Sequence, residues 1–384
     1  MLLAVAGFAS QAQVRVTDSL LPQIAADFHT TVGAAAMVVT AYAVTHGSIQ
    51  LVIGPFGDRF GKYRTVALAC AIGAVLVAIC GMASSLPQLA LARLATGACA
   101  GWIIPISMAY VGDVTPYERR QPILARYLSG QILGQLFGQA AGGVLGDWVG
   151  WRHVFFILAG LFALAAVGLM IELGANPRTR ARGRADETSR GFIADYAAVW
   201  SNRFARVVIV AAFIEGALMW GAFAYVGADL HSRFALSFTL VGVTVAFFGI
   251  GGLIYAGLAK LFVYRLGQIR LALGGGLVLA AAYTGLALSP GRWLAPFAVT
   301  AIGLGFYMLH NTLQTNATQM TPQARGTAVA VFSSALYIGQ TVGVAGGALI
   351  VDSAGAVPLF LGTAATLPAL AFWFAHHLRR ATTQ

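Results

Sequence analysis

The chain has 384 residues, of which 58% are hydrophobic and only 10% are charged, and its mean hydropathy is +0.77. Soluble domains carry about 25% charged residues, so this composition excludes a soluble protein. The net charge of +11 is divided among short polar segments, which argues against nucleic-acid binding. The three cysteines, Cys70, Cys80 and Cys99, lie in apolar segments with no histidine close by, so neither a metal site nor a cofactor is expected.

Apolar segments of about twenty residues follow one another along the chain, and this is the length that crosses a ~30 Å hydrocarbon core as helix. Helices are expected because lipid offers backbone groups no hydrogen bonds. The pattern predicts an all-α integral membrane protein with twelve transmembrane helices. We place the spans at 2–22, 34–54, 65–83, 87–111, 123–146, 152–174, 205–227, 237–259, 270–288, 293–315, 326–350 and 356–376.

Lysine and arginine are distributed unevenly between the loops. With the N-terminus inside the cell, nineteen lie in predicted cytoplasmic loops and the tail, two lie within spans, and three (Arg152, Arg233 and Arg292) lie on the opposite side. This bias predicts a multi-pass protein of the cell (inner) membrane with cytoplasmic N- and C-termini. The segment 175–204 is rich in arginine and has no apolar period, so it is interpreted as a cytoplasmic linker held near the anionic leaflet.

Similar sequences recur in the two halves of the chain. Residues 59–64 read RFGKYR and residues 265–270 read RLGQIR, an offset of 206 positions. Residues 134–143 read GQLFGQAAGG and residues 339–347 read GQTVGVAGG, at an offset of about 205, and the same separation relates Arg120 to Arg325. The repeat predicts two like-oriented six-helix bundles, at 1–174 and 205–384, joined by the linker at 175–204.

Several motifs resemble those of one transporter family. Residues 54–64 read GPFGDRFGKYR, residues 21–28 read LPQIAADF, Arg93 is followed by Gly97 and Gly101, and the span at 123–146 carries Gly134, Gly138, Gly142 and Gly143. This set is similar to the signatures of the major facilitator superfamily, and in particular to its twelve-helix drug:proton antiporter branch. Gln139 stands where the antiporter motif of that branch has a proline.

The resemblance implies that the loop at 54–64 is a conformational latch. In this interpretation Asp58 and Arg59 join an acid at the cytoplasmic end of the fourth span, which Asp113 matches best. The latch set is Gly54, Gly57, Asp58, Arg59, Gly61, Lys62, Arg64 and Asp113. The alternative is that the loop only anchors the chain through its positive charge.

Charged groups inside the predicted spans point to proton coupling, since each costs roughly 2.5–3.5 kcal/mol at a helix centre. Gln11, Arg15, Asp18 and Pro22 share one face of the first span, and Arg93 lies at a similar depth in the fourth. We therefore predict a salt bridge between Arg93 and Asp18, with a purely structural ion pair as the alternative.

Glu215 lies near the middle of the seventh span and has no charged residue close to it in sequence. A buried carboxylate without a partner is costly, so Glu215 is predicted to bind and release the coupling proton together with Asp18, Arg15 and Arg93. A neutral, hydrogen-bonded structural glutamate is the alternative. His310 is a third proton candidate, or else a polar histidine satisfied by its neighbours.

Polar and aromatic residues on several spans are predicted to line a central substrate cavity. These residues are Gln11, Tyr42, Gln131, Gln135, Trp220, Tyr307, His310, Asn311 and Gln314. Gly134, Gly138, Gly142 and Gly143 form a ridge of small residues that is predicted to pack closely against another helix.

These observations predict a secondary transporter that exports small organic or drug-like solutes in exchange for protons by alternating access. Its expected partners are a small-molecule substrate, protons and membrane lipid, with no nucleic acid, and it is expected to act as a monomer. Import of a sugar, nucleoside or organic acid by a symporter or facilitator is the alternative, and a non-transporting sensor is more remote. An enzyme is not expected, because the HExxH and GxSxG motifs are absent from the sequence.

Overall fold

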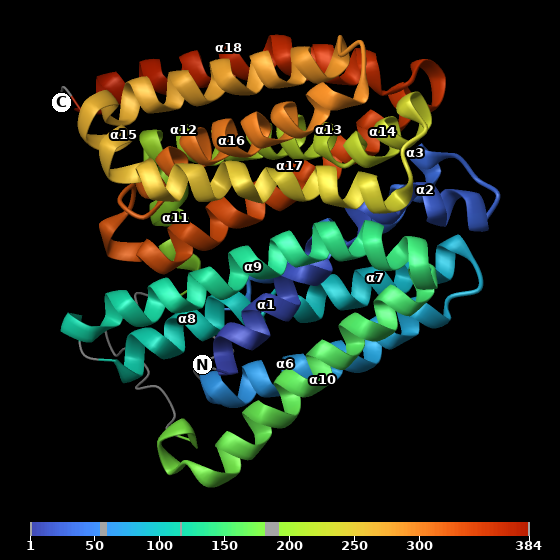
Figure 1. The fold of residues 1–384 in the computed structure, drawn as a ribbon. Coiled ribbons are helices and arrows are strands. Elements are labelled where there is room, and N and C mark those ends of the chain that lie inside the picture. The colour runs from blue at the N-terminus through green and yellow to red at the C-terminus, as the bar shows by residue number, and fades with distance from the viewer. Residues whose placement is uncertain (1, 54–59, 116, 181–191, 383–384) are drawn as a thin grey trace.

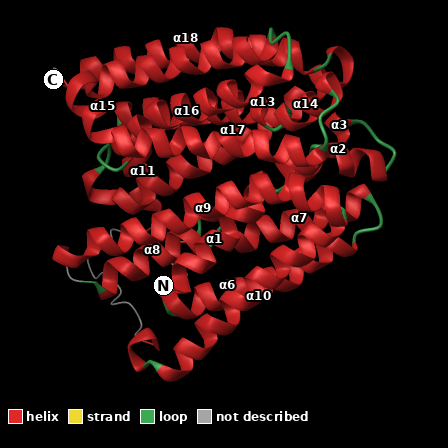
Figure 2. Ribbon diagram, viewed as in Figure 1, coloured by secondary structure: helices red, strands yellow, loops and turns green. Residues whose placement is uncertain are grey.

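The computed structural model describes residues 2–53, 60–115, 117–180 and 192–382. Every regular element in these ranges is a helix (Figure 2). Nine helices within them are long and apolar enough to cross a membrane. The all-α membrane class is therefore confirmed. The nine count α15 once and leave out α1, α2 and α9, so the number twelve stays a prediction.

The first half of the chain contains the helices of the six predicted spans between residues 2 and 174. They are α1 (Leu2–Arg15), α2 (Thr17–Asp27), α3 (Val32–Ala35), α4 (Met37–Gln50), α6 (Lys62–Met82), α7 (Leu86–Ala100), α8 (Ile103–Val114), α9 (Tyr117–Val149) and α10 (Trp151–Ala175). Three of these spans are each built of two helices, with interruptions at Val16, at Ala36 and between Ala100 and Ile103.

The second half begins after the linker. It contains α12 (Arg203–Glu215), the π-helix η2 (Gly216–Trp220), α13 (Gly221–Phe223), α14 (Val226–Phe234), α15 (Phe238–Ala287), η3 (Arg292–Leu294), α16 (Ala295–Ala317), η4 (Pro322–Ala324), α17 (Arg325–Ala354) and α18 (Ala356–Thr382). The predicted spans at 237–259 and 270–288 are the two arms of α15, which bends at Gly267.

The described parts of the linker contain more regular structure than the sequence suggested. It contains η1 (Pro177–Arg180) and a helix, α11 (Phe192–Ser201), although no apolar period was recognised there. Val199 of α11 is fully buried, and the hydroxyl of Tyr196 donates a hydrogen bond to the carbonyl of Leu51 at the end of α4. The burial of Val199 and the hydrogen bond of Tyr196 hold α11 against the protein, whereas Ile193 and Trp200 of the same helix are exposed, so no single apolar face marks the helix in the sequence.

Two helical bundles lie side by side, one blue to green and the other yellow-green to red (Figure 1). Both chain ends and α11 lie toward one end of the molecule, whereas α2, α3 and α14 lie at the opposite end, which we call the far end. Between the bundles, α9 packs on α15, and α17 packs on α3 and α4.

Two pairs of glycines show the repeat in the backbone. Gly61 and Gly267, which are 206 positions apart, have φ angles of 83° and 67°. Gly150 and Gly355, which are 205 positions apart, have φ angles of 81° and 78° and turn the chain from α9 to α10 and from α17 to α18. Positive φ favours glycine, so these four turns require it at matching places in both halves.

The glycines of α9 approach other backbones closely, and a matching contact occurs in the second half. A Cβ atom added at Gly134 of α9 would lie 2.2 Å from the carbonyl oxygen of Phe8 in α1. The equivalent contact, 205 positions later for both residues, is between Gly339 of α17 and Phe213 of α12, at 2.0 Å. Gly138 likewise approaches Ala12 of α1, and Gly142 approaches Val16 between α1 and α2, whereas Gly143 faces Gly242 of α15 in the other bundle.

Candidate functional site

Glu215 ends α12, immediately before the π-helix η2, and its side chain is fully buried. Its Oε2 lies 2.8 Å from the Nδ1 of His310 in α16, so the two groups share one hydrogen. No described residue donates a hydrogen bond to the other oxygen, Oε1. The sequence suggested a carboxylate without a partner; its partner lies 95 residues further along the chain, where sequence proximity could not reveal it.

Close backbone packing fixes the position of Glu215. A Cβ atom at Gly216, the next residue, would lie 2.1 Å from the carbonyl oxygen of Leu336 in α17. The junction between α12 and η2 therefore rests directly on the backbone of α17. Single π-turns inside helices occur frequently at functional sites, because the extra residue re-aims the side chains beside it.

His310 connects the buried carboxylate to an aromatic group. Its ring stacks on Phe306 with centroids 4.7 Å apart and an angle of 15° between the planes. The side chain of His310 is 12% exposed, whereas that of Glu215 is 0% exposed. His310 is therefore the more accessible member of the pair.

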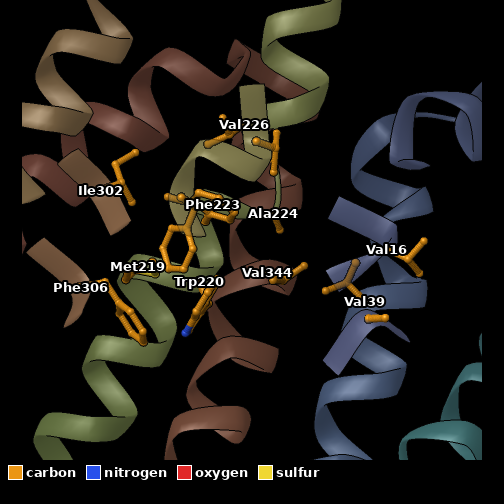
Figure 3. Close-up of a cluster of buried hydrophobic side chains, with 14 of the residues drawn as sticks. Val16, Val39, Met219, Trp220, Phe223, Ala224, Val226, Ile302, Phe306 and Val344 are labelled. Carbon is orange, nitrogen blue, oxygen red and sulfur yellow. The ribbon is translucent and has the colours of Figure 1, made fainter. Parts of the chain in front are cut away.

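The aromatic contacts continue from Phe306 into η2 and then into the first half. Phe306 meets Trp220 edge-on at 5.0 Å, and Figure 3 shows the two rings side by side. The guanidinium carbon of Arg15, at the end of α1, lies 3.3 Å from the centroid of the Trp220 ring. A cation over the face of tryptophan is attracted by the ring quadrupole, so this contact joins the two bundles.

Arg15 also pairs with the second predicted proton carrier. Its Nη1 lies 3.8 Å from Oδ2 of Asp18, whose side chain is 1% exposed. No described residue donates a hydrogen bond to either oxygen of Asp18. A continuous series of side-chain contacts thus leads from one buried acid to the other, across the boundary between the bundles. Its members, in order, are Glu215, His310, Phe306, Trp220, Arg15 and Asp18.

The predicted salt bridge between Arg93 and Asp18 is not formed. Arg93 is fully buried, and it donates hydrogen bonds to the backbone carbonyls of Gln13 and Val38, each at 3.3 Å. Its guanidinium also lies 4.3 Å from the centroid of the Tyr42 ring. The prediction failed because Arg15, on the same helix face as Asp18 and one turn before it, takes the place next to the carboxylate.

The residues predicted to line a substrate cavity differ in burial, and their role stays a prediction. Tyr42 and Trp220 are buried, Gln314 is exposed, and the other members, Gln11, Gln131, Gln135, Tyr307, His310 and Asn311, are half-buried. Two cavities, of about 550 and 370 Å³, are lined by other residues. The smaller one lies between α11, α12 and α17, with Tyr196, Phe213 and Ser334 in its wall.

The latch motif is described in part. Residues 54–59, which include Gly54, Gly57, Asp58 and Arg59, lie outside the described residues. The Nζ of Lys62 lies 2.5 Å from Oδ2 of Asp113, so the predicted acid does contact the motif, although through a different residue. The contact of Asp113 with Asp58 and Arg59 stays a prediction.

Sequence reasoning missed Phe306, which bridges His310 and Trp220. An aromatic residue beside Tyr307 in an apolar helix gives no signal of its own. It also missed Asp147 and Asp352, which lie near the ends of α9 and α17 and bind Thr239 and Thr31 of the other bundle. Among the described residues, no group of three or more His, Cys, Asp or Glu side chains is placed to hold a metal ion.

Comparison with known proteins identifies the family. The family model described as Major Facilitator Superfamily matches residues 3–344. The chain belongs to this superfamily. It is therefore a multi-pass membrane transporter, and the resemblance seen in the motifs is confirmed. Transporters of this superfamily bind small-molecule substrates and are often coupled to protons.

Relatives within the superfamily differ in what is known of them. The chain is 25% identical over 329 residues to the uncharacterized MFS-type transporter YceJ of Bacillus subtilis. This alignment covers 84% of this chain and 82% of YceJ. It is 28% identical over 155 residues to the multidrug export protein EmrB of Haemophilus influenzae. The aligned region covers 40% of this chain and 30% of EmrB.

Solved structures of two other transporters of known fold are similar in shape. A mutant of the nucleoside transporter NupG has a TM-score of 0.78 at 14% identity and covers 97% of this chain and 98% of its own. The POT family transporter PepTSo has a TM-score of 0.78 at 13% identity, covering 100% and 98%. At these identities the likeness shows the fold alone.

Proposed function

We propose that this major facilitator transporter exports small organic or drug-like solutes in exchange for protons, by alternating access. Twelve spans would form two six-helix bundles, at 1–174 and 205–384, that rock against each other in the cell (inner) membrane. The repeated glycine contacts support the two-bundle division, since Gly134 packs on Phe8 in the first half and Gly339 packs on Phe213 in the second. The excess of Lys and Arg supports cytoplasmic termini.

The observation that carries the proposal is the contact series between the two buried acids. Glu215 and His310 act as one proton-binding unit, because they share a hydrogen and any added proton is divided between them. A proton taken up through His310 neutralises the negative charge of the pair. A buried charge is costly, so its loss favours whichever facing state buries the pair more deeply.

The same series couples proton binding to movement of the bundles. Loss of charge at Glu215 and His310 changes the packing of Phe306 on Trp220, which is the ring that holds Arg15 of the other bundle. A substrate that competes for the deprotonated pair would favour the opposite facing state. Exchange follows when proton and substrate occupy the site in turn.

The direction of transport and the class of substrate rest on similarity. The relative EmrB is named a multidrug export protein. The glycine ridge of α9 is similar to the motif of the antiporter branch, and it packs tightly on α1. The aromatic side chains Trp220, Phe248, Phe306 and Tyr307 lie together and would suit a substrate with flat apolar parts.

Symport of a small metabolite, such as a nucleoside, sugar or organic acid, is the second candidate. It is favoured by Gln139, which stands where the antiporter motif has a proline. Gln139 is fully buried, and none of the described residues forms a hydrogen bond with its side-chain atoms. The proton pair serves either direction equally well, so the direction must be measured.

The test uses everted membrane vesicles with an acid interior and a pH-sensitive dye. Ethidium, uridine and glucose, first screened by thermal shift on the purified protein, serve as candidate solutes. Antiport predicts release of protons from the vesicles when the solute is added, and Glu215→Gln should abolish it. Glu172→Gln is the matched control, because Glu172 lies at the end of α10 and bonds only to Asn176 in the interactions described.

Proton movement in the same direction as the solute would establish symport instead. A full response from Glu215→Gln would contradict the proton site assigned here. No proton movement with any solute that the protein transports would contradict proton coupling.

A further inference from the structure

Two aspartates near the ends of equivalent helices each join one bundle to the other at the far end. Asp147 lies two residues before the end of α9, and Asp352 lies two residues before the end of α17. They are 205 positions apart, the same offset that relates the glycine contacts of these helices. They are therefore counterparts in the repeat.

Asp147, of the first bundle, binds the first turn of α15 in the second. Its Oδ2 accepts hydrogen bonds from the hydroxyl of Thr239 at 2.6 Å and from the backbone N–H of Thr239 at 3.2 Å. The nearby Gly143 and Gly242 bring the backbones of α9 and α15 together, since a Cβ atom at Gly143 would lie 2.4 Å from the Cα of Gly242.

Asp352, of the second bundle, binds the start of α3 in the first. Its Oδ2 accepts from the hydroxyl of Thr31 at 2.7 Å, and its Oδ1 accepts from the backbone N–H of Gly33 at 2.9 Å. Gly33 and Thr239, whose backbone N–H groups bind the two carboxylates, are 206 positions apart. Both the acids and their donors therefore follow the repeat, and each bundle supplies one acid and one donor segment.

We propose that Asp147 and Asp352 form a paired latch that holds the far end of the transporter closed. This inference rests on the alternating access proposed above, and the proposed topology puts the far end outside the cell. Opening of that face must separate α9 from α15 and α17 from α3, so it must break both sets of hydrogen bonds. Because the bonds cross in opposite directions between the bundles, they resist separation at two places.

Hydrogen bonds to a charged carboxylate are stronger than those between neutral groups. Loss of either acid should raise the ratio of far-end-open to far-end-closed molecules about tenfold, and loss of both about a hundredfold, because the two act on one equilibrium. Both aspartates are exposed, so their truncation leaves no cavity in the core. Asp147→Ala and Asp352→Ala should therefore leave the protein folded.

The test measures distances between spin labels by pulsed electron paramagnetic resonance, in a variant whose three cysteines are replaced by alanine. Labels at Met82 and Leu288, which are 71% and 64% exposed, report on the far end. Labels at Val114 and Tyr264, which are 49% and 90% exposed, report on the end that holds the termini. Asp27→Ala is the matched control, since Asp27 binds Arg152 within the first bundle, at 2.6 Å and also at the far end.

The paired latch predicts a longer distance between Met82 and Leu288, and a shorter one between Val114 and Tyr264, in the double variant. Each single variant should show a smaller change, and Asp27→Ala should show none. Unchanged distances in the double variant, or an equal change in Asp27→Ala, would overturn it. Unchanged distances together with intact proton release would contradict the paired latch but not proton exchange. If the far end opens in the double variant but the unmodified protein moves no protons, the paired latch is supported and proton exchange is contradicted.

Discussion

Arg15 of the first bundle lies over the face of Trp220 in the second, with its guanidinium carbon 3.3 Å from the ring centroid, and the two residues are 205 positions apart. They are therefore counterparts in the repeat that meet at the boundary between the bundles. Arg15 ends α1 and Trp220 ends η2, so each lies where its span is interrupted. The contact joins the end of α1 to the end of η2.

Replacing Trp220 by leucine should weaken the contact between the bundles. A desolvated cation–π contact contributes about 2 kcal/mol, which is roughly 30-fold in an equilibrium between two facing states. Trp220→Leu should therefore shift the spin-label distances toward the far-end-open state, and Trp220→Phe should shift them less. Trp293→Leu is the control, because Trp293 is 78% exposed. Equal shifts in Trp220→Leu and Trp293→Leu would contradict this role.

Adding a methyl group to either glycine ridge should destabilise the fold. Gly134→Ala and Gly339→Ala would each place a Cβ atom within about 2 Å of a backbone carbonyl oxygen, at 2.2 and 2.0 Å. Overpacking of this kind costs about 1–3 kcal/mol. Thermal unfolding of the purified variants should show similar losses for both. Gly160→Ala and Gly362→Ala, where no atom lies within 4 Å, should unfold like the unmodified protein. Losses of equal size in the control variants would argue against the ridge.

Asp58→Asn should slow transport without affecting insertion. The resemblance implies that Asp58 belongs to a latch that includes Asp113, and the structure places Lys62 of the same motif 2.5 Å from Asp113. Asp113→Asn should therefore have a similar effect. Membrane abundance is measured with a fluorescent fusion and the transport rate with the solute found by thermal shift. A normal transport rate at normal abundance in Asp58→Asn would remove the latch interpretation.

The orientation can be tested with single cysteines in a variant that lacks the three native ones. Leu288→Cys, at the end of α15, should react with a membrane-impermeant maleimide added to intact cells. Ser201→Cys, at the end of α11, should react only after the cells are opened. The opposite result would reverse the topology derived from the distribution of Lys and Arg.

Helix positions could be predicted from the sequence because each long apolar run must form helix in lipid, whatever it packs against. The repeat was also visible, since Gly61 and Gly267 need positive φ, and the glycines of α9 and α17 need close contacts. These requirements act on single residues or on one helix face. They leave a pattern that survives in the sequence.

Partners between helices could not be predicted in the same way. Arg93 and Asp18 lie at similar depths, but the rotation of each helix decided that Arg93 binds backbone carbonyls and Arg15 binds Asp18. His310 was recognised as a proton candidate, yet its contact with Glu215 depends on how α16 packs on α12. Asp147 and Asp352 resemble ordinary loop acids until the bundles are placed together.

Proton release by the purified protein tests the central claim most directly. A saturating solute is added to the detergent-solubilised transporter in weak buffer, and a pH indicator counts the protons released. Because Glu215 and His310 share protons as one unit, the account predicts roughly one proton per bound solute. It also predicts no release from Glu215→Gln and unchanged release from Glu172→Gln. Equal release from Glu215→Gln and the unmodified protein, at equal solute binding, would contradict it.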